Sequence, residues 1–130
     1  MKYSTSWLMS ALFPALLSVA LMSPLTCLAK LVQLKGAVHS PQPGVICDTK
    51  GGFCADAEGI AVALTKLYLG DKAEQKLMDM IRPTSGVQDF DPTLFVLSNH
   101  VACDCKAKRC KVSKYEDKID TAHTKALFGK

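Results

Sequence analysis

The chain has 130 residues, with 16 Lys plus Arg, 12 Asp plus Glu and six cysteines, which is many cysteines for this length. That length suits one small domain and is short for two. The net charge of +4 is too mild to indicate a protein that binds nucleic acid, so we expect no such partner. Composition therefore bounds the size and the class of partner and does not name a function.

The first 29 residues have the pattern of an export signal. Lys2 is their only charge, almost every residue from Trp7 to Ala29 is apolar, and small residues stand at Cys27 and Ala29. We therefore expect a secretory signal peptide over 1–29, cut after Ala29. The alternative is an uncleaved membrane anchor, because the apolar run is nearly long enough to span a bilayer. Two prolines and several serines in the run argue against the anchor.

The rest of the chain, 30–130, is then a single exported domain in the periplasm or outside the cell, with no membrane span. It keeps five cysteines, and an oxidising compartment favours disulfides between them. Because five is odd, one thiol must be free, bonded to another chain or bound to something else. The five are Cys47, Cys54, Cys103, Cys105 and Cys110.

A motif of the form V-x-C-D-x-K-x-x-x-C occurs twice, over 45–54 and 101–110. Each copy is followed by a second motif made of Thr-Lys, three apolar residues and Gly. The shared order indicates an internal duplication with units over about 44–70 and 100–129. In each unit the first Cys ends a β-type apolar run, and the second begins the returning strand.

A hairpin of this kind brings its two cysteines together, which predicts the bridges Cys47–Cys54 and Cys103–Cys110. Alternation along a strand puts Cys105 on the same face as Cys103. A bridge from Cys105 to Cys110 would also suit a tight hairpin, so the pairing in the second unit stays open. The repeat favours Cys103 and leaves Cys105 as a free or intermolecular thiol.

The first half of the exported part begins with a loose lead-in over 30–36, a connector over 41–44 and a hairpin over 45–55. A helix follows and ends at Gly70; its inner face is predicted from three-and-four spacing as Ile60, Leu64, Leu67 and Tyr68. A second helix starts at Asp71 and stops before Pro83. Its inner face is predicted as Ala73, Leu77 and Ile81.

The second half begins with a polar loop over 84–92 and a β-type run over 93–98. A tight turn at Asn99-His100 leads into a strand over 101–104, and the last helix covers 121–128. These elements predict an α+β fold, with a small antiparallel sheet of disulfide-braced hairpins and about three short helices packed on it.

Several short blocks of the chain carry a family resemblance. They are Ser40-Pro41, Gly44-Val45, Cys47-Asp48, Cys54-Ala55-Asp56, Gly59, Leu64-Thr65, Tyr68-Leu69-Gly70, Ser98-Asn99, Cys103-Asp104, Cys110 and Ala126-Leu127-Phe128-Gly129-Lys130. In combination they resemble the YcgJ-like family of small exported bacterial proteins, also described as prophage-protein-like. The resemblance implies export, two cysteine pairs and one domain, and it implies no activity, because the family has no assigned function. Cys105 departs from the family pattern.

A metal site is one candidate function, because thiolate and imidazole ligands suit zinc or copper. Its ligands would be His100, Cys103, Cys105 and Cys110. The C-x-C-x4-C spacing is not that of zinc modules, and an exported protein favours bridges over free thiolates. We therefore expect no metal and no other cofactor, and a metal- or thiol-handling protein remains the alternative.

Two catalytic hypotheses are weaker still. Cys105 would be a nucleophile if His100 or His123 served as its base, but these histidines, like His39, are expected at the surface or in loops. The carboxylates Asp48 and Asp104, with Asp56 and Glu58 near the first bridge, would serve a cryptic hydrolase. An Asp after each Cys is better explained by bonds to turn amides. We therefore expect no catalytic residues and no enzyme.

Basic residues crowd the second hairpin and form the candidate binding loop: Lys106, Lys108, Arg109 and Lys111, with Lys114 close behind. A rigid loop held by a disulfide presents a binding surface at low entropic cost. The expected function is an exported, disulfide-stabilised binding module, such as an envelope inhibitor or an immunity-type protein. Its partner is expected to be a protein or an anionic envelope component, and the sequence leaves the oligomeric state open.

Overall fold

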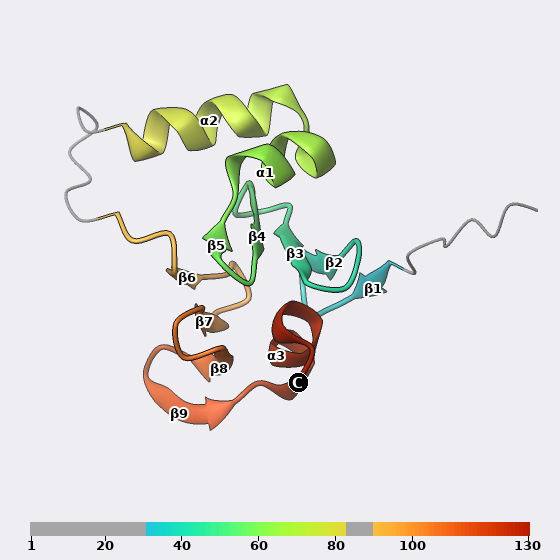
Figure 1. Ribbon diagram of the computed structural model, residues 1–130, viewed down its shortest axis with the longest axis vertical. Coiled ribbons are helices and arrows are strands. Elements are labelled where there is room, and N and C mark those ends of the chain that lie inside the picture. Colours follow the sequence, from blue (N-terminus) through green and yellow to red (C-terminus); the bar gives the residue numbers. More distant parts are fainter. Residues whose placement is uncertain (1–30, 83–89) are drawn as a thin grey trace, which may run out of the picture.

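The computed structural model describes residues 31–82 and 90–130. The predicted signal peptide and most of the predicted loop over 84–92 lie outside these residues. The fold is α+β, as expected, and it contains two small antiparallel sheets where one was predicted (Figure 1). Within the described segments, no helix combines the length and the apolar character that crossing a membrane requires.

The first sheet has five strands that follow one another in chain order. They are β1 (Val32–Gln33), β2 (Val38–Ser40), β3 (Val45–Asp48), β4 (Phe53–Asp56) and β5 (Gly59–Ile60). Strands β3 and β4 form the predicted hairpin, with Cys47 directly opposite Cys54. Strand β1 lies in the expected lead-in, and β2 lies between the lead-in and the expected connector; neither strand was predicted, because so few residues give no strong alternation. Helices α1 (Val62–Leu69) and α2 (Asp71–Ile81) follow.

The second sheet has four strands, again in chain order. They are β6 (Leu94–Val96), β7 (Ala102–Asp104), β8 (Arg109–Ser113) and β9 (Glu116–Ile119), and helix α3 (Thr121–Phe128) closes the fold. Cys103 lies opposite Cys110 in the second hairpin. Strand β9 was missed because all four of its residues are exposed, so it shows no alternation of apolar and polar positions.

Both predicted bridges are present, Cys47–Cys54 and Cys103–Cys110. The sulfur of Cys105 takes part in neither bridge, and its side chain is buried. The second unit therefore has the bridge that the repeat favoured, Cys103–Cys110, and not the alternative Cys105–Cys110.

The two units share one hydrophobic core. Val38, Ile46 and Phe53 face it from the first sheet, while Phe95 and Val101 face it from the second. The rings of Phe53 and Phe95 meet edge to face, with their centroids 5.7 Å apart. Figure 1 shows the resulting layers. Helices α1 and α2 lie above the first sheet, and the second sheet and α3 lie next to each other below the first sheet.

The predicted inner face of α1 is correct for Leu64 and Tyr68, which pack against the first bridge, but the buried side of the helix is rotated toward Thr65. Thr65 is its fully buried residue, whereas Leu67 is 69% exposed and Ile60 belongs to β5. The hydroxyl of Thr65 accepts a hydrogen bond from the backbone N–H of Cys54 at 2.8 Å, which turns this side of the helix to the sheet. Leu67, two residues on, then points away. The inner face predicted for α2 is confirmed, with Leu77 buried.

The repeat in the sequence is also a repeat in structure. The Thr124 hydroxyl of α3 accepts from the Cys110 N–H at 2.9 Å, as Thr65 does from Cys54. Helices α1 and α3 have eight residues each and end at a glycine whose N–H bonds back to a lysine carbonyl. Each unit is therefore a bridged hairpin tied by one threonine to a short helix.

Candidate binding surface on the second sheet

Among the described elements, no helix packs on the outer face of the second sheet; α3 packs on its other face. On the edge strand β6, Leu94 and Val96 are 53% and 47% exposed, and Phe95 between them is buried. The paired strands add polar and charged side chains to the same face. We call this surface the open face and define it by the side chains of Leu94, Val96, Ala102, Asp104, Lys111 and Lys114.

The corresponding face of the first sheet is buried. By the repeat, Leu94, Val96 and Ala102 occupy the places of three buried residues. Those three are Val38, Ser40 and Ile46. In the first unit this face packs against the second unit. The same face is thus a protein contact in one copy of the repeat, and in the other copy no described element covers it.

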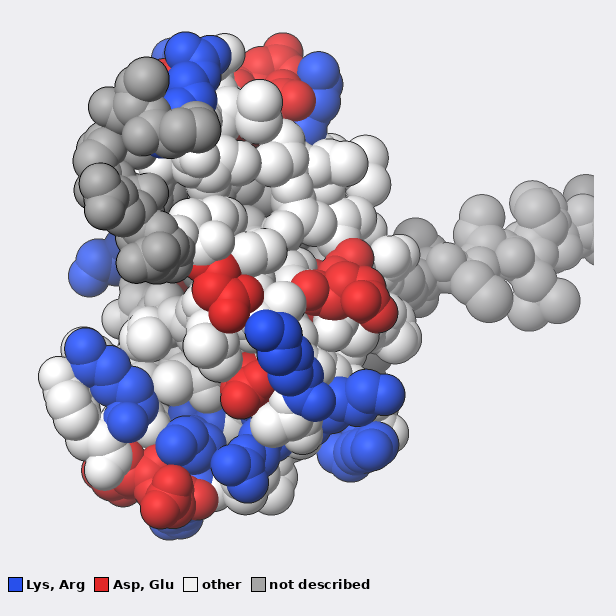
Figure 2. Space-filling model, turned by 60° about the vertical axis from the view of Figure 1, so that its left-hand side comes forward, with Lys and Arg blue, Asp and Glu red and all other residues white. Residues whose placement is uncertain are grey.

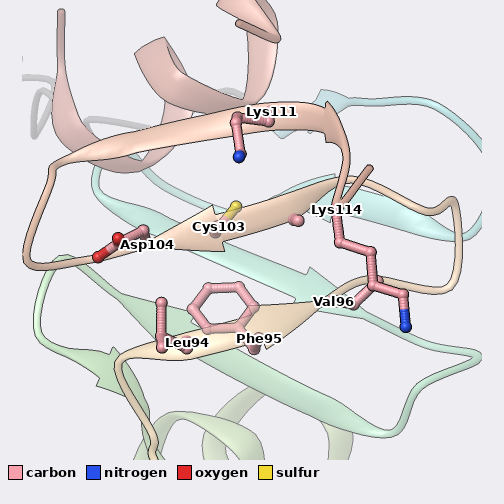
Figure 3. A pocket seen from close by; sticks show the side chains of 8 residues that line it. Leu94, Phe95, Val96, Cys103, Asp104, Lys111 and Lys114 are labelled. Atoms are coloured by element: carbon pink, nitrogen blue, oxygen red, sulfur yellow. The ribbon is translucent and has the colours of Figure 1, made fainter. Parts of the chain in front are cut away.

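A hollow of about 340 Å³ lies on the open face. Figure 3 shows Leu94 and Asp104 toward one end, Val96 and Lys114 toward the other, and Lys111 between them. A second hollow of about 170 Å³ also uses Val96 and Lys114 and continues to His100, Ser113 and Tyr115. Together the two hollows form a shallow track with an apolar floor and basic side chains along it.

The track ends at an exposed aromatic ring. Tyr115 is 85% exposed, and the Nζ atom of Lys114 lies 5.0 Å from the centroid of its ring. Tyrosine is among the residues enriched at protein interfaces. No sequence signal marks Tyr115, Leu94 or Val96 as binding residues, because an isolated tyrosine and a strand-like apolar run are both common in cores.

The candidate binding loop divides into two parts in the structure. At the hairpin tip, Lys106 lies 3.8 Å from a carboxylate oxygen of Asp91, and Lys108 has a positive φ. On the sheet, Lys111 belongs to the open face, and its Nζ lies 3.3 Å from Asp117. Figure 2 shows the basic side chains gathered over the lower part of the molecule, with acidic side chains among them.

Asp48 and Asp104, the main carboxylates considered for catalysis, differ in their exposure. Asp48 is completely buried: it accepts hydrogen bonds from the Gly51 N–H and from both the N–H and the hydroxyl of Ser98. Asp104 lies on the open face and accepts from the amides of Lys106 and Ala107 at 3.0 Å each. The prediction that both bind turn amides is confirmed, and Asp48 is held in the core by groups that leave it no access to a substrate.

The structure also argues against a reactive thiol at Cys105 and against the predicted alternative of a metal site. Burial, together with the negative charge of nearby carboxylates, Asp56 foremost, raises the pKa of the Cys105 thiol to about 11. A thiol with such a pKa is a poor nucleophile at neutral pH. The bridge joining Cys103 to Cys110 removes two of the four ligands of the metal hypothesis. Across 31–82 and 90–130, no three or more His, Cys, Asp or Glu residues are grouped as metal ligands would be.

His123 does not lie at the surface as expected. It is buried in α3, its Nδ1 lies 2.8 Å from Asp120, and its Nε2 lies 2.9 Å from the Asn99 side-chain nitrogen. With both ring nitrogens engaged, His123 is not available as a base for Cys105. Of the other histidines, His39 is half-buried in β2 and His100 is exposed at the end of the track.

These features define a small, disulfide-braced α+β domain with an apolar and basic sheet face that no element in 31–82 or 90–130 covers. The chain belongs to the YcgJ protein family, whose profile matches residues 38–128. It is 36% identical over 100 residues to the uncharacterized protein YcgJ of Escherichia coli (strain K12), an alignment that spans 72% of this chain and 75% of that protein. No solved structure matches the chain.

Proposed function

We propose that this protein is an exported, non-enzymatic binding module of the cell envelope that contacts a partner protein through the open face. The observation that carries the proposal is the exposure of two apolar side chains, Leu94 and Val96, on a rigid sheet. Their counterparts in the first unit, Val38 and Ser40, are buried, and Val38 packs in the core that the two units share. Exposed apolar surface with a polar rim is characteristic of interaction sites.

The disulfides support a location outside the cytoplasm, because two bridges in a small domain require an oxidising compartment. Export to the periplasm or the medium is the narrower proposal, and it rests on the apolar N-terminal run. The intact mass of the exported protein tests it: the expected value corresponds to a start at Lys30 with four hydrogens lost to two bridges. An inhibitor or immunity-type role is the form of binding module that small size and a braced surface favour.

The contact surface is tested by photo-crosslinking in cells that export the protein. A photoreactive phenylalanine analogue is placed at Val96 or Tyr115 on the track, or at Leu67 as a matched exposed position on α1. We expect one crosslinked product of discrete mass from both track positions and none from Leu67. Absence of a product at the track, or equal products at all three positions, would contradict the proposed function.

A further inference from the structure

We infer that the open face accommodates an acidic segment of a partner protein, one that alternates apolar and carboxylate side chains. The inference rests on the proposed binding function and specifies the chemistry of the partner. Leu94, Val96 and Ala102 form the apolar floor of the hollow, and Lys111 and Lys114 stand along it. A segment with period-two alternation presents apolar groups to such a floor and carboxylates to the lysines.

The lysines are available for a new partner to different degrees. In the described part of the chain, Lys114 has a ring contact with Tyr115 and no carboxylate within ion-pair distance. Lys111 has Asp117, whose side chain is completely exposed and so is free to move aside. The Lys111 side chain is only 26% exposed, and a charge shielded from water attracts an incoming carboxylate more strongly than a fully hydrated one does.

The first unit shows how such a face engages protein. There Asp48 uses one carboxylate oxygen for turn amides and presents the other to the backbone N–H of Ser98, which belongs to the docked unit. Asp104 occupies the same place on the open face and uses its Oδ1 for the equivalent turn amides. In the described residues no hydrogen bond occupies its Oδ2, which is placed to accept a backbone N–H from a docked segment.

The same residues disfavour a membrane or a polyanionic glycan as the occupant. Asp104 lies within the track, Asp117 lies beside its Lys111, and Asp91 lies beside Lys106 at the hairpin tip. An extended anionic surface would bring negative charge against all three carboxylates, and like charges in proximity are repulsive. A protein segment places a few carboxylates only where the lysines stand.

The experiment is a titration of the isotopically labelled exported domain followed by two-dimensional NMR. The probes are an octapeptide that alternates Val and Asp, its counterpart that alternates Val and Lys, and vesicles rich in anionic phospholipid. With the Val–Asp peptide we expect shifts of the backbone amides of Leu94, Val96, Ala102 and Lys111, which weaken as salt screens the lysines. With the Val–Lys peptide and with the vesicles we expect no shifts on this face.

A charge reversal completes the test. The double variant Lys111→Glu and Lys114→Glu should bind the Val–Asp peptide at least about ten-fold more weakly and gain binding of the Val–Lys peptide. Lys114→Glu alone should weaken binding in the same direction, and it retains the ion pair between Lys111 and Asp117. Lys72→Glu with Lys76→Glu on α2 is the matched control and should bind as the unaltered domain does.

No shift with the Val–Asp peptide, equal binding of both peptides, or shifts with vesicles alone would overturn the inference. The crosslinking at Val96 and Tyr115 does not depend on any of these peptide results, so the two proposals can fail separately. A crosslinked partner without Val–Asp binding would therefore reject the acidic segment and retain the proposed function. Loss of crosslinking would reject the proposed function itself.

Discussion

Two side chains adopt a left-handed backbone conformation where the repeat has glycine. His100 and Lys108 have φ values of 74° and 52°, and they are the non-glycine residues with positive φ in the described segments. Their counterparts in the first unit, Gly44 and Gly52, have φ values of 86° and 79°. A side chain in this region costs about 1–2 kcal/mol relative to the right-handed one, and glycine avoids most of that cost. The second unit therefore retains local strain that the first does not have.

Replacing the strained residues should stabilise the protein. His100→Gly and Lys108→Gly are each expected to raise the free energy of unfolding by about 0.5 kcal/mol, because relief of strain exceeds the added backbone entropy of glycine. The reverse changes, Gly44→His and Gly52→Lys, should lower it by about 1 kcal/mol. A Cβ at either glycine meets no atom within 4 Å, so backbone conformation alone is tested. Urea unfolding gives the free energy of unfolding of all four variants. A lower free energy for Lys108→Gly would show that the backbone at this position is not strained.

The carboxylate of Asp120 couples stability to pH. Burial by itself would raise the pKa of Asp120, but hydrogen bonds from the backbone and the ring of His123, together with the ring's charge, lower it below its usual value of 3.8. A lowered pKa in the folded state stabilises the protein above the unfolded pKa, and that stability is lost as pH falls through the folded one.

Asp120→Asn keeps an oxygen that accepts from His123 and removes the titration. Between about pH 5 and pH 3 we expect the unfolding free energy of the unaltered protein to fall more steeply than that of the variant. Chemical denaturation at a series of pH values gives both slopes. Parallel slopes would show that Asp120 has the same pKa in the folded and unfolded chains.

At the scale of elements, a single hydroxyl joins each hairpin to its helix. The Thr65 hydroxyl also donates to the Ala61 carbonyl, and the Thr124 hydroxyl lies within hydrogen-bond distance of the Asp120 and Cys110 carbonyls. Each threonine thus satisfies a buried strand N–H and its own bonding capacity at once. This explains why Thr, and not an apolar residue, occupies the most buried position of α1.

Thr65→Val and Thr124→Val should each destabilise the protein by about 1–3 kcal/mol, because the shape is kept while the N–H of Cys54 or Cys110 loses its acceptor. Thr65→Ser and Thr124→Ser keep the hydroxyl and should lose much less. Thermal unfolding of the four variants gives the comparison. Equal losses for Val and Ser would assign the effect to packing and not to the hydrogen bond.

Most elements were predictable because their patterns are local. The residues of β3, the end of α2 before Pro83 and the limits of α3 all follow from spacing, capping and helix-breaking residues within one element. Strand β9 was not predictable, because its exposed, charged residues show no alternation. The rotation of α1 depends on a bond from Thr65 to another element and has no local signature.

At the scale of the whole molecule, Asp48 joins the two units. It has no exposed surface, and its carboxylate binds turn amides of its own hairpin and Ser98 of the other unit. Asp104, its counterpart, binds its own turn alone and stays partly exposed. One repeated residue therefore has a long-range role in the first unit and a local role in the second.

Asp48→Asn should cost about 2–4 kcal/mol, because an amide NH₂ in place of an acceptor leaves buried donors unsatisfied. Asp104→Asn should change stability by no more than about 0.5 kcal/mol. Since the units share one core, we expect a single unfolding transition for both variants. Guanidinium titrations followed by fluorescence and by circular dichroism would expose two separate transitions if the units unfold independently.

The sequence by itself determined the repeated unit: its bridged hairpin, its short helix and the turn aspartates. These features depend on residues close together in the chain, and the prediction for one copy of the repeat is strengthened by the same pattern in the other. Only the tertiary structure decided which face of each sheet is covered. The alternation of a strand separates its two faces but does not say which one meets the other unit, so Leu94 and Val96 have the pattern of core residues and yet lie on the open face.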